Sequence, residues 1–330
     1  MRTICLIPGD GIGPEVVDAS RALLEATDLD VSFVTAEAGW ETFERHGTSV
    51  PQATFDAMVG CDATLVGAFA SPSRKVEGFT GAIRVLRRHF NMYANLRPAK
   101  SRPVSTSRPG LDMLMVRENT EGLYIGGERR YGNTAIADCV ITQEASERIA
   151  RVAMKEARAR SGRLAVIHKA NVLNLTSGLF LETVMQVAAE NSDIKVEQHI
   201  VDVTALKLVT EPEKFDVLVT TNLFGDILSD LMAGLVGGLG LAPSSNIGDS
   251  HAMFEPVHGT APDIAGKGIA NPMAAFLSAA MMLEYLGESE WARRIETAVD
   301  DVLQDGPTTP DLRGNGTTAD VTRAVIGALA

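Results

Sequence analysis

Short apolar runs alternate with amphipathic stretches along the first part of the chain, and this pattern predicts strands that alternate with helices. The expected strands are residues 3–7, 31–37 and 63–67, and the expected helices are one that ends near Ala26 and others at 40–46, 53–59 and 81–89. Strands and helices in this order form a sheet covered by helices. We therefore expect an α/β fold.

The pattern changes near residue 93, where the chain becomes extended and then rich in proline as far as Pro109. Such a segment is typical of a crossover into a second lobe. Beyond it we expect strands at 111–116, 164–167, 196–201 and 215–220 and helices at 145–159 and 176–190. An alternating run after Gly126-Gly127 predicts a β-arm near residues 122–142 that contacts another subunit.

The last part of the chain is rich in glycine and then helical, with few strands of its own. It is expected to pack back on the N-terminal strands. The predicted organisation is one discontinuous domain of residues 1–92 and 237–330, and a second domain of residues 93–236.

Polar side chains follow four successive strands of the second domain. They are Arg117 and Tyr124, then Lys169 and Asn171, then Asp202, and finally Asp226 and Asp230. Ligands of open α/β sheets bind outside the carboxyl ends of the strands, so these side chains predict a site. Asp226 and Asp230 share one face of a predicted helix, which suits a cation. For such a pair alone, a solvated acidic face with one residue capping the helix is the commoner explanation.

The composition limits the classes of function. With 330 residues and 45% apolar content, the chain is long enough for two lobes. A net charge of -12 and a pI near 5.0 argue against binding to nucleic acid or anionic membranes. Because no long apolar span or signal-peptide pattern is present, we expect a cytoplasmic protein. The three cysteines have no CxxC spacing and are expected to be free buried thiols.

Arginines are dense in one segment of this acidic chain, which predicts a site for a small polyanion. They are Arg84, Arg87, Arg88, Arg97, Arg102, Arg108 and Arg117. The first turn, Gly9-Asp10-Gly11-Ile12-Gly13, resembles a Rossmann opening only weakly, because its spacing is GxGxG. A tight turn without a dinucleotide explains it as well.

Six motifs taken together resemble the β-decarboxylating dehydrogenases, the family of isocitrate, 3-isopropylmalate, homoisocitrate and tartrate/D-malate dehydrogenases. They are the turn at Gly9–Gly13, Ala94-Asn95-Leu96-Arg97-Pro98, Arg117-Glu118-Asn119-Thr120-Glu121-Gly122-Leu123-Tyr124, His168-Lys169-Ala170-Asn171, Asn222-Leu223-Phe224-Gly225-Asp226-Ile227-Leu228-Ser229-Asp230 and Glu255-Pro256-Val257-His258-Gly259. The resemblance spans nearly the whole chain and is greatest to homoisocitrate dehydrogenases of lysine biosynthesis. It implies two α/β lobes with a cleft between them, a fold that is not Rossmann, and a homodimer or tetramer whose subunits share active sites.

The resemblance also implies the chemistry of the site. Asp226 and Asp230, with Asp202 from a second subunit, match the family's ligands for Mg²⁺ or Mn²⁺, ions that prefer oxygen donors. Lys169, contributed across the dimer, matches the lysine that helps to remove the hydroxyl proton. Tyr124 matches the acid that protonates the enolate carbon.

The expected substrate is a tricarboxylate. Arg87, Arg97 and Arg117 match the family's carboxylate-binding arginines, a task suited to the planar guanidinium. Arg84 offers a charge to a third carboxylate, unless it points to solvent. Further candidate contacts are Ser71, which could instead cap a turn, and Asn171. The predicted activity is oxidative decarboxylation of homoisocitrate to 2-oxoadipate, with isocitrate or 3-isopropylmalate as alternative substrates.

The predicted cofactor is NAD. NADP-using relatives carry a Lys-Tyr pair where this chain has Asp263-Ile264, and an aspartate favours the ribose hydroxyls over a 2′-phosphate. The other predicted cofactor contacts are Glu255, His258, Gly259 and Asn271, the last of which could equally cap a helix. A non-catalytic regulatory subunit of an isocitrate dehydrogenase is the alternative from another class, but the predicted catalytic and metal residues are all present.

Overall fold

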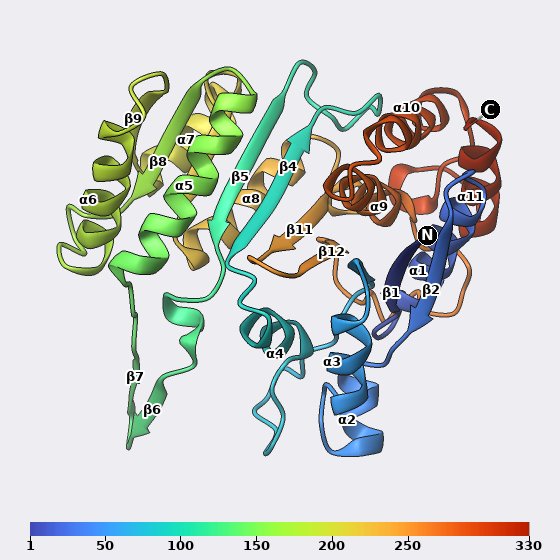
Figure 1. Cartoon of the computed structure of the whole chain (residues 1–330), viewed down its shortest axis with the longest axis horizontal. Helices are drawn as coiled ribbons and strands as arrows, with labels where there is room; N and C mark the ends of the chain where they lie inside the picture. The colour runs from blue at the N-terminus through green and yellow to red at the C-terminus, as the bar shows by residue number, and fades with distance from the viewer. Residues whose placement is uncertain (330) are drawn as a thin grey trace.

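One sheet runs through the whole molecule, which we describe from a computed structural model for residues 1–329 (Figure 1). Its strand order is β2-β1-β3-β12-β11-β4-β5-β10-β8-β9. The strands are β1 Arg2–Ile7, β2 Val31–Thr35, β3 Ala63–Val66, β4 Ala94–Lys100, β5 Asp112–Glu118, β8 Arg163–His168, β9 Lys195–Ile200, β10 Val217–Thr220, β11 Pro243–Ile247 and β12 Ala252–Pro256. Helices and strands alternate as expected, which confirms the α/β class.

Eleven helices accompany the sheet in residues 1–329. They are α1 Gly13–Glu25, α2 Trp40–His46, α3 Gln52–Val59, α4 Ala82–His89, α5 Gln143–Ala159, α6 Thr176–Ala189, α7 Val201–Thr210, α8 Asn222–Leu235, α9 Met273–Tyr285, α10 Ser289–Asp305 and α11 Thr318–Gly327. None of them is both long and apolar enough to cross a membrane.

The centre of the sheet differs from its two ends. Strands pair in parallel from β2 to β12 and again from β5 to β9, whereas β11 and β4 pair with their neighbours in antiparallel fashion. A Rossmann sheet has a single parallel order of strands, so this arrangement excludes that alternative. The antiparallel centre also joins the strands that come before and after the chain's crossover near residue 93.

The glycine-rich turn before α1 holds neighbouring segments of the fold together. Asp10 is buried, and its carboxylate accepts hydrogen bonds from the backbone N–H of Trp40 at 2.8 Å, Glu41 at 3.0 Å and Ala70 at 2.8 Å. Gly11 has φ +62°, and a Cβ there would lie 2.2 Å from the carbonyl oxygen of Thr260. The turn therefore fixes α2 and the loop that follows β12, which is a sufficient reason for its glycines.

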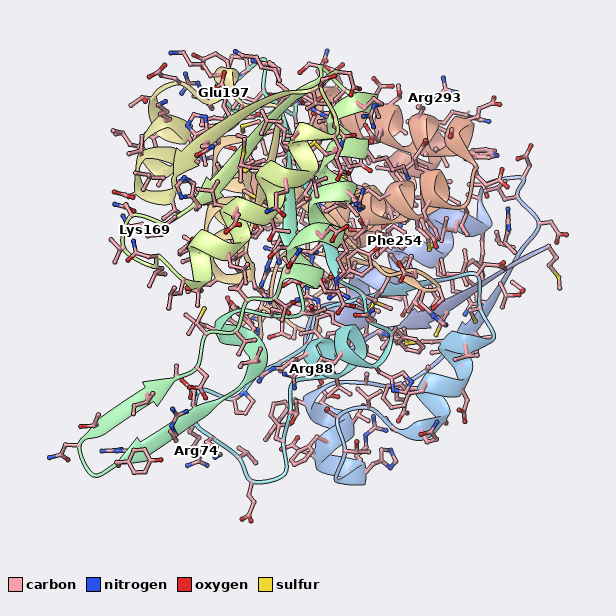
Figure 2. All side chains as sticks on the ribbon, turned by 60° about the vertical axis from the view of Figure 1, so that its left-hand side comes forward. Arg74, Arg88, Lys169, Glu197, Phe254 and Arg293 are labelled. Carbon is pink, nitrogen blue, oxygen red and sulfur yellow. The ribbon has the colours of Figure 1, made fainter. Side chains whose placement is uncertain are left out.

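A two-stranded arm projects from the body of the molecule (Figures 1 and 2). Its strands β6 Glu128–Tyr131 and β7 Thr134–Ala137 pair with each other, and all their residues are exposed. Tyr131 and Ile136 thus present apolar surface to solvent. The predicted arm is present, but its contact with another subunit stays a prediction.

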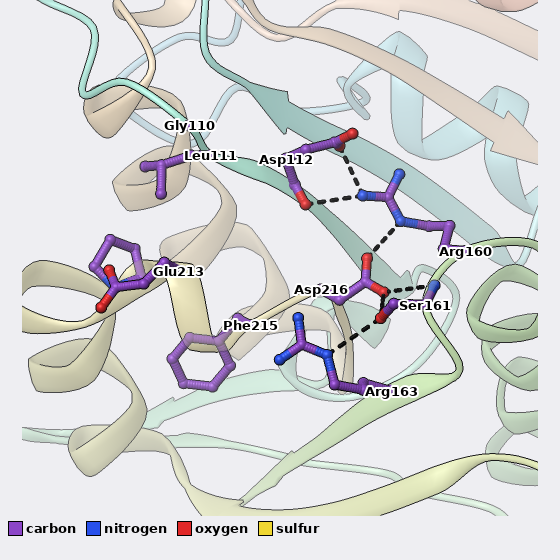
Figure 3. A pocket seen from close by; sticks show the side chains of 10 residues that line it. Gly110, Leu111, Asp112, Arg160, Ser161, Arg163, Glu213, Phe215 and Asp216 are labelled. Atoms are coloured by element: carbon purple, nitrogen blue, oxygen red, sulfur yellow. Dashed lines mark hydrogen bonds and ion pairs between the residues drawn. The ribbon is translucent and has the colours of Figure 1, made fainter.

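The amino ends of β5, β8 and β10 lie along one edge of the sheet, where four residues form what we name the back cluster (Figure 3). They are Asp112, Arg160, Ser161 and Asp216. Arg160 donates from Nε to Asp216 at 2.6 Å and from Nη2 to Asp112 at 2.7 Å. The other oxygen of Asp216 accepts from the backbone N–H and the hydroxyl of Ser161.

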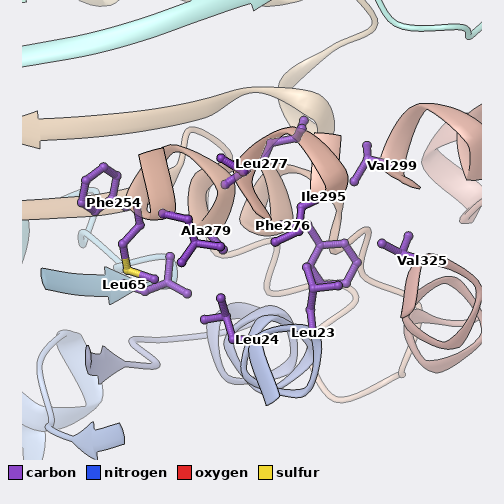
Figure 4. Packing of buried hydrophobic residues seen from close by; sticks show 14 of the residues in the cluster. Leu23, Leu24, Leu65, Phe254, Phe276, Leu277, Ala279, Ile295, Val299 and Val325 are labelled. Carbon is purple, nitrogen blue, oxygen red and sulfur yellow. The ribbon is translucent and has the colours of Figure 1, made fainter. Parts of the chain in front are cut away.

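Segments from both ends of the chain share one hydrophobic core (Figure 4). Leu23 of α1, Phe276 of α9, Ile295 of α10 and Val325 of α11 are all fully buried in it. A separate core lies between β5, β8 and β10 on one side and α5 and α6 on the other. These cores agree with the predicted domains, whose boundary nevertheless stays a prediction.

Four elements and one thiol differ from the sequence-based expectations. Strands β4, β11 and β12 were not predicted as strands, and Asp202 begins helix α7 instead of ending a strand. Helix α7 is hard to recognise because its buried residues are only Thr204 and Leu208, while Leu206 is exposed. All three cysteines are free, but Cys139 is exposed, so the expectation of buried thiols was wrong for it.

Candidate active site

Arg117, at the carboxyl end of β5, is the centre of a compact cluster of charges. It is almost completely buried, and it donates from Nε at 3.0 Å and from Nη2 at 2.6 Å to the side-chain oxygen of Asn222. Its Nη1 donates to Asp226 of α8 at 2.5 Å. The hydroxyl of Tyr124 donates to the other oxygen of Asp226 at 2.5 Å. One carboxylate thus links the predicted acid to a predicted substrate arginine.

Arg97 reaches the same helix from β4. Its Nη1 donates to the hydroxyl of Ser229 at 2.8 Å and lies 3.3 Å from a carboxylate oxygen of both Asp226 and Asp230. Neither aspartate caps α8, whose N-cap is Thr221. The capping alternative for this pair is therefore wrong. We call the set of Arg87, Arg97, Arg117, Tyr124, Asp226 and Asp230 the front cluster.

Burial and charge shift the ionisation of the front cluster. Burial lowers the pKa of Arg117 to about 9, and the charges of Arg97 and Arg87 add to the effect. Burial opposes ionisation of Asp226, but the charge of Arg117 and the hydrogen bond from Tyr124 outweigh it, so the pKa of Asp226 lies below its ordinary value. Burial and the bond to Asp226 raise the pKa of Tyr124, which is therefore protonated at neutral pH.

Helix α4 brings further arginines to the cluster. Arg87 donates from Nη2 to Glu255 at 2.8 Å, and both side chains are largely buried. Arg84 is exposed, and its Nη1 lies 3.3 Å from where a Cβ on Gly126 would be, beside the 3₁₀ turn Leu123–Ile125 that carries Tyr124. Arg88 is exposed, and it donates to the carbonyl of Ile125 at 2.6 Å.

Two predicted substrate contacts have exposed side chains. The hydroxyl of Ser71 lies 3.6 Å from where a Cβ on Gly81 would be, at the start of α4, and within residues 1–329 no hydrogen bond of this hydroxyl caps a turn. Asn171 follows β8 and is exposed.

Lys169 and Asp202 form a separate pair. Lys169, after β8, donates from Nζ to Asp202 at 2.6 Å, and Asp202 lies in the first turn of α7. Figure 2 shows Lys169 well apart from Arg88 of α4. Within the described part of one chain, no three acidic, histidine or cysteine side chains come together as a possible metal site. The predicted catalytic and metal residues therefore fall into two groups.

The front cluster suits a hard divalent cation on chemical grounds. Asp226 and Asp230 supply carboxylate oxygens from successive turns of α8, and their side chains are 34% and 52% exposed, which leaves them open to a ligand. Burial raises the pKa of Asp230, although the charge of Arg97 acts in the opposite direction. Two carboxylates are few for such an ion, so a third oxygen donor has to come from water, substrate or another chain.

The loop after β12 has features that fit a bound ligand. The Nε2 atom of His258 is buried and has no hydrogen-bond partner in the described part of the chain, while Nδ1 lies 3.0 Å from the carbonyl of Gly259. Gly259 is exposed, and no atom lies within 4 Å of where its Cβ would be, so a ligand can approach the backbone closely. Asp263 is exposed and Ile264 packs against the core beneath the loop.

Both polar atoms of the Asn271 side chain form hydrogen bonds with other residues of the chain. Its oxygen accepts from the backbone N–H of Met273 at 3.0 Å, and its amide donates to Asp311 at 2.9 Å. The N-cap of α9 is Pro272 and not Asn271, so the capping alternative for Asn271 is wrong, although its oxygen binds the first residue of the helix. Its contact with adenine stays a prediction.

Two residues of the site, and the partner of a third, were missed from the sequence. Asn222 and Ser229 anchor Arg117 and Arg97, and Glu255, predicted only as a cofactor contact, pairs with Arg87. Asn222 lies two residues after the end of β10, and Ser229 lies three residues after Asp226. Both therefore had the same signal as the predicted residues, a polar side chain just after a strand or on the helix that carries Asp226.

Comparison with known proteins gives a consistent result across the whole chain. The family described as isocitrate/isopropylmalate dehydrogenase matches residues 3–325. An isocitrate/homoisocitrate dehydrogenase of Thermus thermophilus is 65% identical over 99% of this chain and 98% of its own length. A 3-isopropylmalate/3-methylmalate dehydrogenase of Methanocaldococcus jannaschii is 51% identical over 98% of each chain.

A solved structure agrees with these relatives. The isocitrate dehydrogenase from Methylococcus capsulatus superposes with a TM-score of 0.96 at 46% sequence identity, and the alignment covers 100% of this chain and 99% of the other. This likeness confirms the predicted dehydrogenase fold. The chain belongs to the isocitrate/isopropylmalate dehydrogenase family, the β-decarboxylating dehydrogenases.

Proposed function

We propose that the chain is an NAD-dependent, metal-assisted enzyme that oxidises and decarboxylates homoisocitrate to 2-oxoadipate, with isocitrate as an alternative substrate. The observation that carries the choice of a tricarboxylate is the position of Arg84. It lies one turn before Arg87 and beside the turn of Tyr124, and no carboxylate within residues 1–329 pairs with it. A guanidinium in that place favours a third carboxylate over an apolar substituent.

The side chains of the front cluster suit the reaction. Asp226 and Asp230 would hold a divalent cation, which would supply Lewis-acid polarisation of the ketone, and NAD⁺ would supply the hydride acceptor for the 2-hydroxy acid. Arg87, Arg97 and Arg117 hold the substrate carboxylates. The β-carboxylate leaves as CO₂, and Tyr124 gives its proton to the enolate carbon, a role that its raised pKa supports.

A second copy of the chain would complete the site. Because both carboxylates of the front cluster are assigned to the metal, we assign the removal of the hydroxyl proton to Lys169 of the partner subunit, with Asp202 of the partner subunit as the third metal ligand. Helix α7 exposes Val203, Leu206 and Val209, and α8 exposes Ile227. Apolar side chains gathered on two packed helices suit a homodimer interface. Because Tyr124, Lys169 and the three aspartates are all present, a regulatory subunit is the less favoured alternative.

NAD is favoured over NADP by the loop after β12. Asp263 is exposed there and can accept hydrogen bonds from the ribose hydroxyls, whereas its charge would repel a 2′-phosphate. The nearby Lys267 is also exposed and opposes this preference weakly.

The test is a kinetic comparison of homoisocitrate, isocitrate, 3-isopropylmalate and D-malate with both cofactors. We expect the highest kcat/KM with homoisocitrate and NAD⁺. Replacing Arg84 by Val should lower kcat/KM for the tricarboxylates by about tenfold or more and raise the relative rate with 3-isopropylmalate. Arg74→Val, which removes an equally exposed charge from a nearby loop, is the control and should leave the preference unchanged. An unchanged preference in Arg84→Val would refute the assignment.

A further inference from the structure

A chain of buried amides lies at the centre of the sheet, beneath the front cluster. Asn95 of β4 and Asn246 of β11 are fully buried, and Asn119, just after β5, is 6% exposed. Asn95 donates to Asn246 at 3.2 Å and Asn119 donates to the same oxygen of Asn246 at 2.9 Å. Buried amides of this kind need partners for both the oxygen and the nitrogen.

The contacts of Asn246 fix the orientation of its amide. Because its oxygen already accepts from two amides, its nitrogen points the other way and donates to Oε1 of Glu255 at 2.7 Å. Turning the amide over would place its oxygen against a carboxylate and its nitrogen against two donors. The amide nitrogen of Asn246 therefore has a fixed position, from which it donates to Glu255 and, at 3.4 Å, to the carbonyl of Met253.

The hydrogen bonds continue from Glu255 to the front cluster. The same Oε1 atom that accepts from Asn246 also accepts from Nη2 of Arg87 at 2.8 Å. The side chains of Arg87 and Glu255 are 12% and 11% exposed. Within residues 1–329 no group accepts from Nη1 of Arg87, and its buried Nε has no partner either. Glu255 thus binds one end of the guanidinium and leaves the rest available to a ligand.

We propose that Asn246 is a positioning residue of the substrate site, which holds Glu255 so that its carboxylate sets the direction of Arg87. This inference rests on the proposed role of Arg87 in binding a substrate carboxylate. Fixing the guanidinium before the substrate arrives reduces the conformational entropy lost on binding. Asn246 touches neither the substrate nor the cofactor in this account.

Two substitutions separate this role from simple stabilisation of the sheet. Asn246→Leu removes the donor at similar volume, and Asn246→Asp keeps the shape but replaces the donor with an acceptor. The control is Ser244→Ala on the same strand. The hydroxyl of Ser244 accepts a buried hydrogen bond from Asn95 at 2.7 Å. The backbone of Ser244 pairs with that of Glu255 across β11 and β12, but within residues 1–329 its hydroxyl forms no hydrogen bond with the Glu255 carboxylate. All three changes remove a buried hydrogen bond and should lower the melting temperature.

The expected kinetic result is a change in KM. In both Asn246 variants, KM for the substrate should rise about tenfold, equivalent to about 1.4 kcal/mol, because a displaced Arg87 weakens ground-state and transition-state binding alike. Titration calorimetry with substrate and Mg²⁺ in the absence of NAD⁺ should show the same loss of affinity. In Ser244→Ala, KM and the calorimetric affinity should not change.

The pH dependence gives a second readout. The ionisable groups that face Glu255 are Arg87 of α4 and Arg97 of β4. In Asn246→Asp the introduced carboxyl faces Glu255, and once this introduced carboxyl is protonated at lower pH it donates to Glu255, so the missing donor returns. The rise in KM should therefore shrink as the pH falls from about 8 to about 6, whereas in Asn246→Leu it should not.

Crystal structures of the Asn246 variants test the inference without requiring that the substrate be known. We expect Glu255 and Arg87 to move from their native positions in both variants. If KM rises in Ser244→Ala as much as in the Asn246 variants, or if Arg87 keeps its place in Asn246→Asp, the inference is overturned. If the unmutated enzyme oxidises a different acid from homoisocitrate, only the proposed substrate is wrong. The KM values of the variants and of the unmutated enzyme are then measured with that acid, and the inference about Asn246 is still tested.

Discussion

The front cluster and the back cluster bring aspartates and arginines together at opposite ends of the same parallel strands, but they differ in how completely they are paired. In the back cluster, Arg160 has two carboxylate partners and Asp216 accepts from three donors. In the front cluster, the Nε atoms of Arg87 and Arg97 are buried without hydrogen-bond partners among residues 1–329. Asp230 there is about half exposed.

The difference separates a structural ion-pair network from a site. Burial opposes ionisation of Asp216, but Ser161 and Arg160 outweigh it and hold its pKa low. Its charge is thus neutralised within the fold. In the front cluster, by contrast, the buried donors that have no partner among residues 1–329 are arginine nitrogens. The positive charges of these arginines repel that of Arg117 and, together with its burial, lower the pKa of Arg117. Unsatisfied buried groups and repelling like charges cost stability, and a bound polyanion removes both costs.

The largest effect is expected at the centre of the front cluster. Asp226→Asn should lower kcat/KM by about a thousandfold or more, because it removes a predicted metal ligand and the partner of both Tyr124 and Arg117. Steady-state kinetics with the best substrate measure this, and circular dichroism checks the fold. A loss of less than about tenfold would mean that Asp226 is not a metal ligand.

The matched change in the back cluster should affect stability alone. Asp216→Ala leaves Arg160 without its buried partner and should cost about 3 kcal/mol of unfolding free energy, with kcat/KM of the folded enzyme unchanged. Because the pKa of Asp216 is depressed in the fold, its contribution is complete above its ordinary pKa of 3.8 and is lost as the pH falls through the lower folded value. Urea titrations of both proteins at pH 7 and pH 3 measure this, and an equal difference at the two pH values would contradict it.

A glycine of α8 tests how tightly the front cluster is packed. A Cβ on Gly225 would lie 2.6 Å from Cγ and 2.8 Å from Cβ of Arg117, so Gly225→Ala should cost about 1–3 kcal/mol and raise KM. Gly234→Ala on the same helix is the control, since no atom lies within 4 Å of its Cβ position, and it should stabilise the protein by about 0.5–1 kcal/mol. Equal stabilities of the two variants would show that Arg117 gives way freely.

The smallest effect is expected at the rim of the back cluster. Arg163 is exposed and donates to the hydroxyl of Ser161 at 3.2 Å and to the carbonyl of Lys214 at 3.2 Å (Figure 3). Arg163→Ala should change the unfolding free energy by less than about 1 kcal/mol and leave activity unaltered. A clear loss of activity would mean that this edge of the sheet has a role in the reaction.

Sequence patterns predicted the strands and helices in which apolar and polar positions alternate with a regular period. The strands that end near Arg117, Lys169 and Asp226 and the helices between them were found because apolar and polar positions alternate regularly there. The motifs also predicted that Arg97, Arg117, Tyr124 and Asp226 belong together, as the contacts confirm.

The antiparallel centre of the sheet could not be predicted in the same way. Strand β4 contains Arg97 and Pro98, and β11 consists largely of buried polar residues, so neither has a strand-like pattern. The pairing of Arg87 with Glu255 depends on β11 and β12 inserting between β3 and β4, which is a long-range contact that local patterns do not contain. The link through Asn246 was missed for the same reason.

The central claim is that the front cluster of one subunit works with Lys169 of the partner subunit. The most direct test combines Asp226→Asn in one subunit with Lys169→Ala in the other, in heterodimers purified through two different affinity tags. Each variant homodimer should be inactive. If subunits share sites, the heterodimer has one intact site and should show about half the wild-type kcat. A heterodimer as inactive as its parents would contradict the claim, because each chain would then carry its own complete site.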